Sequence, residues 1–169
     1  VLHDGSRVDE SPASVRDLVD HQQEWESELL LDPAFFGRIS DLLPDVVGVD
    51  VQLKRSRFRN ELTDYRYDVI LHKRGADLVS LTDVPVREWS STQDVETYLA
   101  TVRPRALRIT GVPNDRVTAQ VAAAIRLASG AGTLVRELFE ATDTRPGVDP
   151  ETLCEIGAEL GYTVHPTWS

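Results

Sequence analysis

The chain has no methionine and only one cysteine among its 169 residues. A single cysteine excludes an internal disulfide and favours a reducing compartment, so we expect a cytoplasmic protein. No apolar run approaches the ~20 residues of a membrane-spanning helix, and no basic-then-apolar leader opens the chain, so we expect no membrane association. Because natural chains begin with methionine, we expect Val1 to be the start of an excised segment or of the ordered part of a longer chain.

Basic residues are also scarce, with 18 Lys and Arg against 28 Asp and Glu and a net charge of −10. Phosphate binding needs a basic face, so nucleic acid is not an expected partner. The histidines show no ligand spacing, and no metal site is predicted. Cys154 lies in a helical apolar pattern, Thr152 to Ile156, which favours packing in a core over a nucleophilic role.

The composition, 41% apolar and 27% charged, is that of an ordinary globular domain. We divide the chain into a linker or loop (1–13), a segment with the densest polar motif (14–75) and a C-terminal subdomain (76–169). Predicted helices and strands alternate throughout, so the expected fold class is α/β.

In the first half, Ser14 is expected to cap a helix whose apolar face runs to Leu29. Asp32-Pro33 starts a second helix over 34–43, and its inward side chains are predicted to be Phe35, Phe36, Ile39 and Leu43. Residues 47–53 and 65–72 alternate apolar and polar side chains, which predicts two strands that pair antiparallel.

In the second half, a weaker strand is predicted over 78–81 and a helix from the Ser91 cap to Val102. A strand over 106–110 ends at Gly111, and Asn114 is expected to cap a helix over 115–128. The Ala-rich face of that helix suits packing on a sheet; it consists of Val117, Val121, Ala124 and Ile125. A further helix is expected over 134–141, and Asp149-Pro150 is expected to start another that runs to Leu160, before a last strand over 162–164.

The densest polar motif is Asn60-Glu61-Leu62-Thr63-Asp64-Tyr65-Arg66-Tyr67-Asp68, which runs into apolar Val69-Ile70-Leu71. Polar groups at the mouth of a buried strand are costly to desolvate unless they serve a site. A basic run precedes the motif, comprising Lys54, Arg55, Arg57 and Arg59. It suits either an anionic ligand or, as the sequence favours, a solvated loop.

The motif resembles the "NEL-S/T-x-Y-RY" signature of the methyltransferase domains of nonribosomal peptide synthetases. The resemblance begins at Glu28-Leu29-Leu30-Leu31-Asp32-Pro33-Ala34-Phe35-Phe36 and continues through 49–55 and 107–114 to 160–169. It implies the C-terminal part of a Rossmann-like class I methyltransferase sheet, with an antiparallel strand pair and an additional α/β segment. It also implies methyl transfer from S-adenosylmethionine to the α-amine of an aminoacyl group on a peptidyl carrier domain, beside an adenylation domain.

The resemblance implies that Glu61, Tyr65 and Asn60 are catalytic, and that Arg66 and Tyr67 bind substrate. Glu61 would accept the amine proton or hydrogen-bond the ammonium, and the tyrosines would face a cationic centre. Asn60 and Arg66 would orient Glu61 or hold the carrier-tethered carbonyl. The structural alternative is a surface pair of Arg66 with Asp68 beside two ordinary core-edge tyrosines.

The cofactor-binding residues cannot be assigned, because the Gly-rich loop of the family is absent from the chain. Gly130-Ala131-Gly132 lacks the third glycine, which would fall at Val135, and it follows a helix rather than a strand, so we interpret it as a helix-ending turn. We therefore expect the isolated chain to bind S-adenosylmethionine weakly or not at all. A non-catalytic binding or scaffolding module that keeps this half of the fold is the competing hypothesis.

Overall fold

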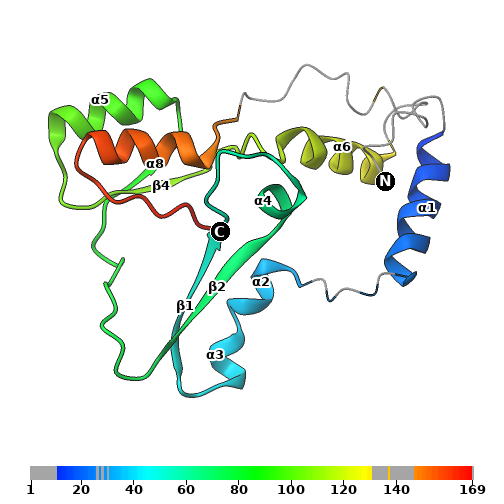
Figure 1. Cartoon of the computed structure of the whole chain (residues 1–169), viewed down its shortest axis with the longest axis horizontal. Helices are drawn as coiled ribbons and strands as arrows, with labels where there is room; N and C mark the ends of the chain where they lie inside the picture. The colour runs from blue at the N-terminus through cyan, green and yellow to red at the C-terminus, as the bar shows by residue number, and fades with distance from the viewer. Residues whose placement is uncertain are drawn as a thin grey trace. The chain divides into compact units, whose positions relative to one another are not determined.

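The computed structural model describes residues 11–25, 27, 29, 31–130, 137 and 147–168 (Figure 1). The chain forms two compact units, each built from two stretches of sequence. The first unit comprises 1–30 and 117–146, and the second comprises 31–116 and 147–169. In the described residues, helices are combined with one antiparallel and one parallel strand pair, so the α/β class is confirmed. Among the described residues, no helix has the length and apolar character needed to cross a membrane.

The antiparallel pair consists of β1 (Val46–Leu53) and β2 (Tyr67–Lys73), with a register irregularity between Val46 and Gly48. Pairing of these two segments was predicted from their alternation, and it is confirmed. The predicted start of the second strand at Tyr65 is wrong. Residues 61–65 form a short helix instead, α4 (Glu61–Tyr65), because the preceding Asn60 caps it.

The C-terminal segment lies along the other edge of β1. The Leu53 amide donates to the Pro166 carbonyl at 3.0 Å, and the Trp168 amide donates to the Val51 carbonyl at 3.0 Å. The bridge between Gln52 and Thr167 lies between these two bonds. The strand predicted over 162–164 is therefore wrong, and the pairing occurs a few residues later.

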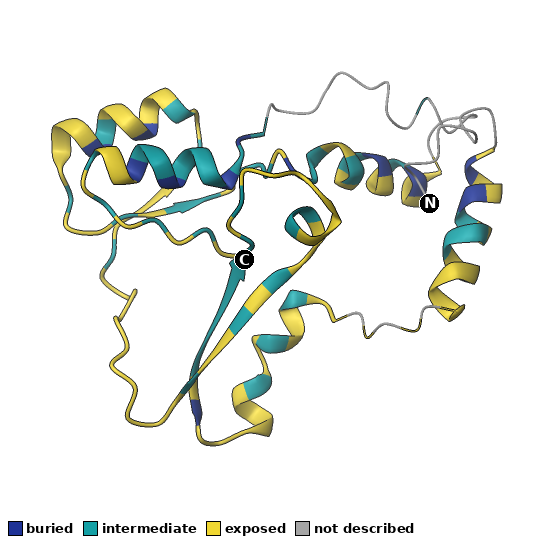
Figure 2. Cartoon of the chain, viewed as in Figure 1, coloured by how far each residue is buried: buried dark blue, intermediate teal, exposed yellow. Residues whose placement is uncertain are grey.

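The parallel pair joins β3 (Val86–Glu88) and β4 (Arg108–Thr110). The connection between them holds α5 (Thr92–Val102), and Ser91 caps this helix as predicted. Helix α8 (Pro150–Glu159) begins at the predicted Asp149 cap and packs against α5. Both helices carry buried residues, drawn dark blue in Figure 2. Cys154 of α8 is buried, so its predicted place in a core is confirmed. The strand predicted over 78–81 does not form.

Two short helices, α2 (Pro33–Phe36) and α3 (Ile39–Leu42), replace the single helix predicted over 34–43. The Gly37 amide donates to the carbonyl of Ala34 at 3.2 Å, three residues back, and such a bond tightens and ends a helical turn. Asp32 caps α2 as predicted. Phe36 and Ile39 are half-buried, whereas Phe35 and Leu43 are exposed, contrary to the prediction.

In the first unit, α1 (Pro12–Trp25) packs on α6 (Thr118–Ser129) through Val15, Ala123 and Leu127. Helix α1 begins before the predicted Ser14 cap, because the Ser11 hydroxyl accepts the Ser14 amide at 3.2 Å. It ends at Trp25, so the predicted extension to Leu29 is wrong.

Helix α6 buries a different face from the one predicted. Ala123 and Leu127 are buried, whereas Ala124 is exposed and Val121 and Ile125 are 47% and 64% exposed. The helix also begins at Thr118 rather than at 115, because residues 115–117 form a turn. Gly130, at a φ of 71°, ends α6, which confirms the predicted helix-ending turn at that residue. The helix predicted over 134–141 lies outside the described residues except at position 137.

Candidate functional site

The signature motif folds as a one-turn helix with a hydrogen-bonded cap. The Asn60 side-chain oxygen accepts the backbone amides of Leu62 and Thr63, at 3.0 and 3.1 Å. In return, the Asn60 amide donates to the Thr63 hydroxyl oxygen at 3.0 Å. That hydroxyl donates to the Phe58 carbonyl at 2.9 Å. Such a box satisfies amides that would otherwise be unpaired at a helix N-terminus, so Asn60 fixes where α4 begins.

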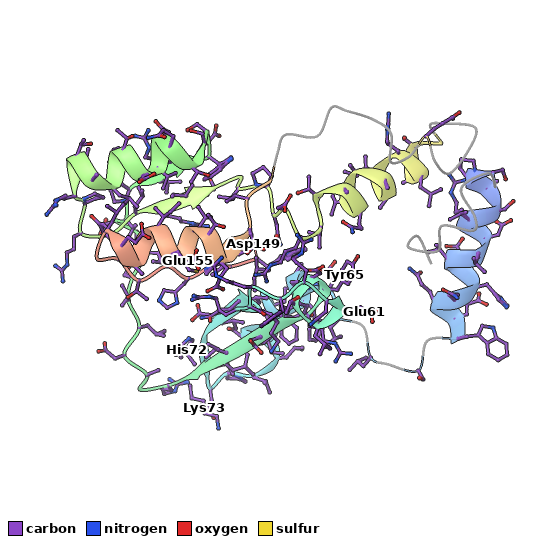
Figure 3. The ribbon with its side chains drawn as sticks, turned by 45° about the horizontal axis from the view of Figure 1, so that its top comes forward. Glu61, Tyr65, His72, Lys73, Asp149 and Glu155 are labelled. Carbon is purple, nitrogen blue, oxygen red and sulfur yellow. The ribbon has the colours of Figure 1, made fainter. Side chains whose placement is uncertain are left out.

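Glu61 and Tyr65 are four residues apart on α4, a spacing that places side chains on one side of a helix (Figure 3). Both side chains are exposed. Within the described part of the chain, the Glu61 carboxylate has no hydrogen-bond or ion-pair partner. Phe58 and Leu62 are also exposed, at 81% and 55%. The surface around α4 thus offers a carboxylate with no partner among the described residues, a phenol and apolar side chains.

Three of the four residues of the basic run before α4 are exposed, as predicted for a solvated loop, and all four form ion pairs. Its four members reach carboxylates on β2, α8 and α4: Lys54 pairs with Asp68, Arg55 with Glu151, Arg57 with Glu155 and Arg59 with Asp64. The pair of Arg55 with Glu151 is bidentate, with Nε and Nη2 at 2.9 and 2.6 Å from the two carboxylate oxygens. These hydrogen bonds lower the pKa of Glu151 against the opposing effect of burial. An anionic ligand at the run would therefore compete with these carboxylates.

Tyr67 is turned toward the segment that leads into α2. Its phenol donates to the Leu31 carbonyl, and its ring meets Phe36 edge-on at a centroid distance of 6.1 Å. Burial raises the pKa of Tyr67, and the negative charge of Asp32 adds to the increase. Arg66 follows α4 at its C-cap and is exposed. The structure thus gathers Asn60, Glu61, Tyr65 and Arg66 around α4, whereas the Tyr67 phenol has a structural partner.

The sequence reasoning missed Arg116, which is 1% exposed and is the only buried charged residue in the described ranges. Its guanidinium donates to the carbonyls of Lys54 at 2.5 Å, Ser56 at 2.6 Å and Thr63 at 3.2 Å. It also binds both Asp149 carboxylate oxygens, at 3.1 and 3.3 Å. Burial raises the pKa of Asp149, but the Arg116 hydrogen bonds and the other favourable contacts outweigh it, so the net pKa is lowered.

A close backbone approach brings Arg116 and Asp149 together. The Val148 amide donates to the Pro113 carbonyl at 2.9 Å, and the Asp115 amide donates to the Val148 carbonyl at 3.2 Å. Gly147 makes this approach possible, because a Cβ there would lie 2.6 Å from both N and Cα of Asp115. No local sequence pattern predicts this contact, because its two segments are more than thirty residues apart.

Gly130, the described residue of the Gly130-Ala131-Gly132 candidate, does not open a glycine-rich cofactor loop. Gly130 serves as the C-cap of α6, and no described strand leads into it. In the described ranges, no group of three or more His, Cys, Asp or Glu side chains is placed to hold a metal ion. The chemistry available at α4 is therefore that of a carboxylate, a phenol and a guanidinium.

Comparison with known proteins identifies the class to which this arrangement belongs. No protein-family model matches the chain. The chain is 36% identical over 156 residues, 92% of its length, to a probable non-canonical nonribosomal peptide synthetase, CymA, of Salinispora arenicola (strain CNS-205). It is 32% identical over 154 residues, 85% of its length, to chondramide synthase cmdD of Chondromyces crocatus. It is also 38% identical over 87 residues to nonribosomal peptide synthetase TES of Alternaria alternata.

These matches cover 92%, 85% and 50% of this chain but only 2%, 4% and 2% of the three relatives. The chain is a homologue of one short segment of nonribosomal peptide synthetases. The synthetase part of the resemblance noted in the sequence is thereby confirmed.

Proposed function

We propose that the chain is the C-terminal part of an S-adenosylmethionine-dependent methyltransferase domain of a nonribosomal peptide synthetase. Its substrate would be the α-amine of an aminoacyl group on a peptidyl carrier domain. The observation that supports this most is Glu61, a carboxylate without a partner among the described residues, at the centre of the signature motif. Homology to synthetase segments over most of the chain adds support.

The residues of α4 are suited to hold an amine that becomes positively charged. An amine attacks only through a neutral lone pair, and its nitrogen becomes cationic as it forms a fourth bond. Glu61 accepts the departing proton or hydrogen-bonds the ammonium. Tyr65 offers a phenol oxygen or a ring face to the same cation. Asn60 orients Glu61 by fixing the start of α4, and Arg66 with the Tyr67 ring borders the carrier-tethered carbonyl.

S-adenosylmethionine would supply the methyl group, but Gly130, as the C-cap of α6, does not fit the glycine-rich loop that would hold it. We place its cradle in other parts of the parent synthetase, and we assign this chain only the acceptor side of the site. In this proposal, the pair of β1 and β2 is the C-terminal part of a Rossmann-like sheet. The parallel pair of β3 and β4, with α5 and α8, forms the additional α/β segment.

Two contacts favour a second candidate, a non-catalytic binding or scaffolding module. The Asn60 oxygen is bound to two backbone amides, and the Tyr67 phenol is bound to the Leu31 carbonyl. Two of the five expected site residues therefore have structural roles. In such a module the signature would serve to fold α4 against β2, without turnover.

The deciding experiment is single-turnover methylation by the complete parent synthetase of a carrier-loaded aminoacyl substrate, with cofactor binding measured in parallel. Glu61→Gln keeps the shape of the side chain and removes its charge, and such electrostatic and proton-transfer roles are worth ~10²-fold in rate. We expect a loss of about that size with unchanged cofactor affinity, and a smaller loss for Tyr65→Phe.

Glu96→Gln is the matched control, because Glu96 is an exposed glutamate on α5. Near-wild-type turnover in Glu61→Gln would show that the Glu61 carboxylate does not act on the substrate amine. A folded parent that binds no cofactor and methylates no carrier-loaded substrate would favour the scaffolding module.

A further inference from the structure

Arg116 stands out because a buried guanidinium requires an acceptor for every donor. Removal from water is costly for a charge unless it is paired and fully hydrogen-bonded. Its donors are all matched, by the carboxylate of Asp149 and by the carbonyls of Lys54, Ser56 and Thr63. A side chain this completely satisfied holds its partners in one arrangement.

The three carbonyls all belong to α4 or to the connection that leads into it. Lys54 and Ser56 follow β1, and Thr63 lies within α4. In a five-residue helix, the carbonyl of Thr63 has no amide four residues ahead inside the helix, so Arg116 provides a donor that the helix lacks. Arg116 thereby ties both the approach to α4 and its middle to the N-terminus of α8, where Asp149 is the cap.

Arg59 adds a second link between the Arg116 segment and the connection that leads into α4. From the same connection, its Nη2 donates to the Arg116 carbonyl at 3.0 Å. Its other nitrogens pair with Asp64 on α4 at 3.1 Å and with Asp115 at 3.3 Å. The segment that carries the signature is therefore held at several points by the side chains of Arg116 and Arg59.

Helix α4 needs such support, since isolated helices shorter than ~12 residues are marginal in water. The direction in which Glu61 and Tyr65 point depends on how the backbone of α4 is held. We propose that Arg116, paired with Asp149, is a positioning residue that sets the orientation of the Glu61 and Tyr65 side chains for the reaction. This inference rests on the proposed function; Arg116 itself touches no substrate.

The test uses the complete parent synthetase with Arg116→Gln, Arg116→Lys and Asp149→Asn. A misplacement of about 1 Å costs ~10²-fold in rate, so single-turnover methylation by Arg116→Gln should fall about 10²-fold. The affinity for S-adenosylmethionine and the KM for the loaded carrier should not change. Arg116→Lys keeps the charge opposite Asp149 with fewer donors, and it should recover part of the lost rate.

Arg57→Gln is the control, because it removes an arginine of the same connection whose partner is Glu155 and whose side chain is exposed. It should methylate at the wild-type rate. Hydrogen exchange at the amides of residues 62–65 gives a second measurement that does not depend on methylation. Exchange there should be faster in the Arg116 and Asp149 variants and unchanged in Arg57→Gln.

Wild-type turnover together with slow exchange in Arg116→Lys and Asp149→Asn would overturn the inference, even if Arg116→Gln failed to fold. So would a loss of turnover matched by equal losses of cofactor affinity and of folded protein, which a purely structural role predicts. A wild-type parent without methyl transfer would refute the proposed function instead, and the exchange measurement would still decide whether Arg116 holds α4.

Discussion

Replacing Asp149 by Asn measures what the buried pair contributes to stability. Removing one partner of a buried ion pair typically costs ~3–5 kcal/mol. Here the cost should be smaller, because the Asp149 side chain is 25% exposed and Arg116 keeps three carbonyl acceptors. We expect a loss of about 2 kcal/mol, which corresponds to a urea midpoint lower by about 1 M for a typical denaturant slope.

The pKa of Asp149 also predicts how the stability loss in Asp149→Asn depends on pH. The pKa of Asp149 in the folded chain lies below its ordinary value of 3.8, so the ionised form is the stabilising one. Its contribution is present above about pH 4 and is lost as the pH falls through the folded value. The stability difference between wild type and Asp149→Asn should therefore be constant from about pH 7 to about pH 5 and shrink in more acidic solution.

Urea unfolding followed by tryptophan fluorescence checks both expectations in a Trp25→Phe background. Trp25 is exposed and belongs to the first unit, so the remaining signal comes from Trp89 and Trp168 in the second. Asp68→Asn breaks the more exposed pair with Lys54 and should cost about 0.5 kcal/mol, a usual value for surface pairs. Equal losses in the two variants, or a difference that does not shrink in acid, would refute the reasoning.

Two further predictions follow from packing. Cys154 is buried and burial raises its pKa, so iodoacetamide should modify it slowly in the native chain and fully in urea; rapid native labelling would contradict this. Gly147→Ala places a Cβ 2.6 Å from the backbone of Asp115, and such overpacking costs ~1–3 kcal/mol, measurable as a lower urea midpoint. An unchanged midpoint would show that the two backbones can separate freely.

Local patterns were sufficient where the structure depends on local forces. Alternation over 47–53 predicted β1, and the caps Ser91 and Asp149 predicted the starts of α5 and α8. Alternation wrongly placed Tyr65 in a strand. Asn60 and Thr63 form a capping box that starts a helix there instead. That signal was present in the sequence, since Asn is a favoured N-cap residue.

Other features depend on contacts that no window of sequence contains. Residues 78–81 have the composition of a strand, but in the described ranges they pair with no other strand. The sequence around Arg116 indicates a solvated residue near a helix start. Its burial depends on carbonyls more than fifty positions away, which no local pattern contains. The ion pairs of Arg55 with Glu151 and of Arg57 with Glu155 were missed for the same reason, since these partners lie about a hundred residues further on.

The pairing of charges around α4 bears on how Glu61 should be interpreted. From Lys54 to Asp68, each other charged side chain has a partner, and Glu61 alone has none among the described residues. A carboxylate at the first position of a helix also stabilises it through the helix dipole, typically by ~0.3–1 kcal/mol. That role alone predicts a small stability loss in Glu61→Gln and no effect on rate. A catalytic role predicts a large loss of rate and little loss of stability. Measuring the methylation rate and the unfolding free energy of Glu61→Gln therefore separates the two roles.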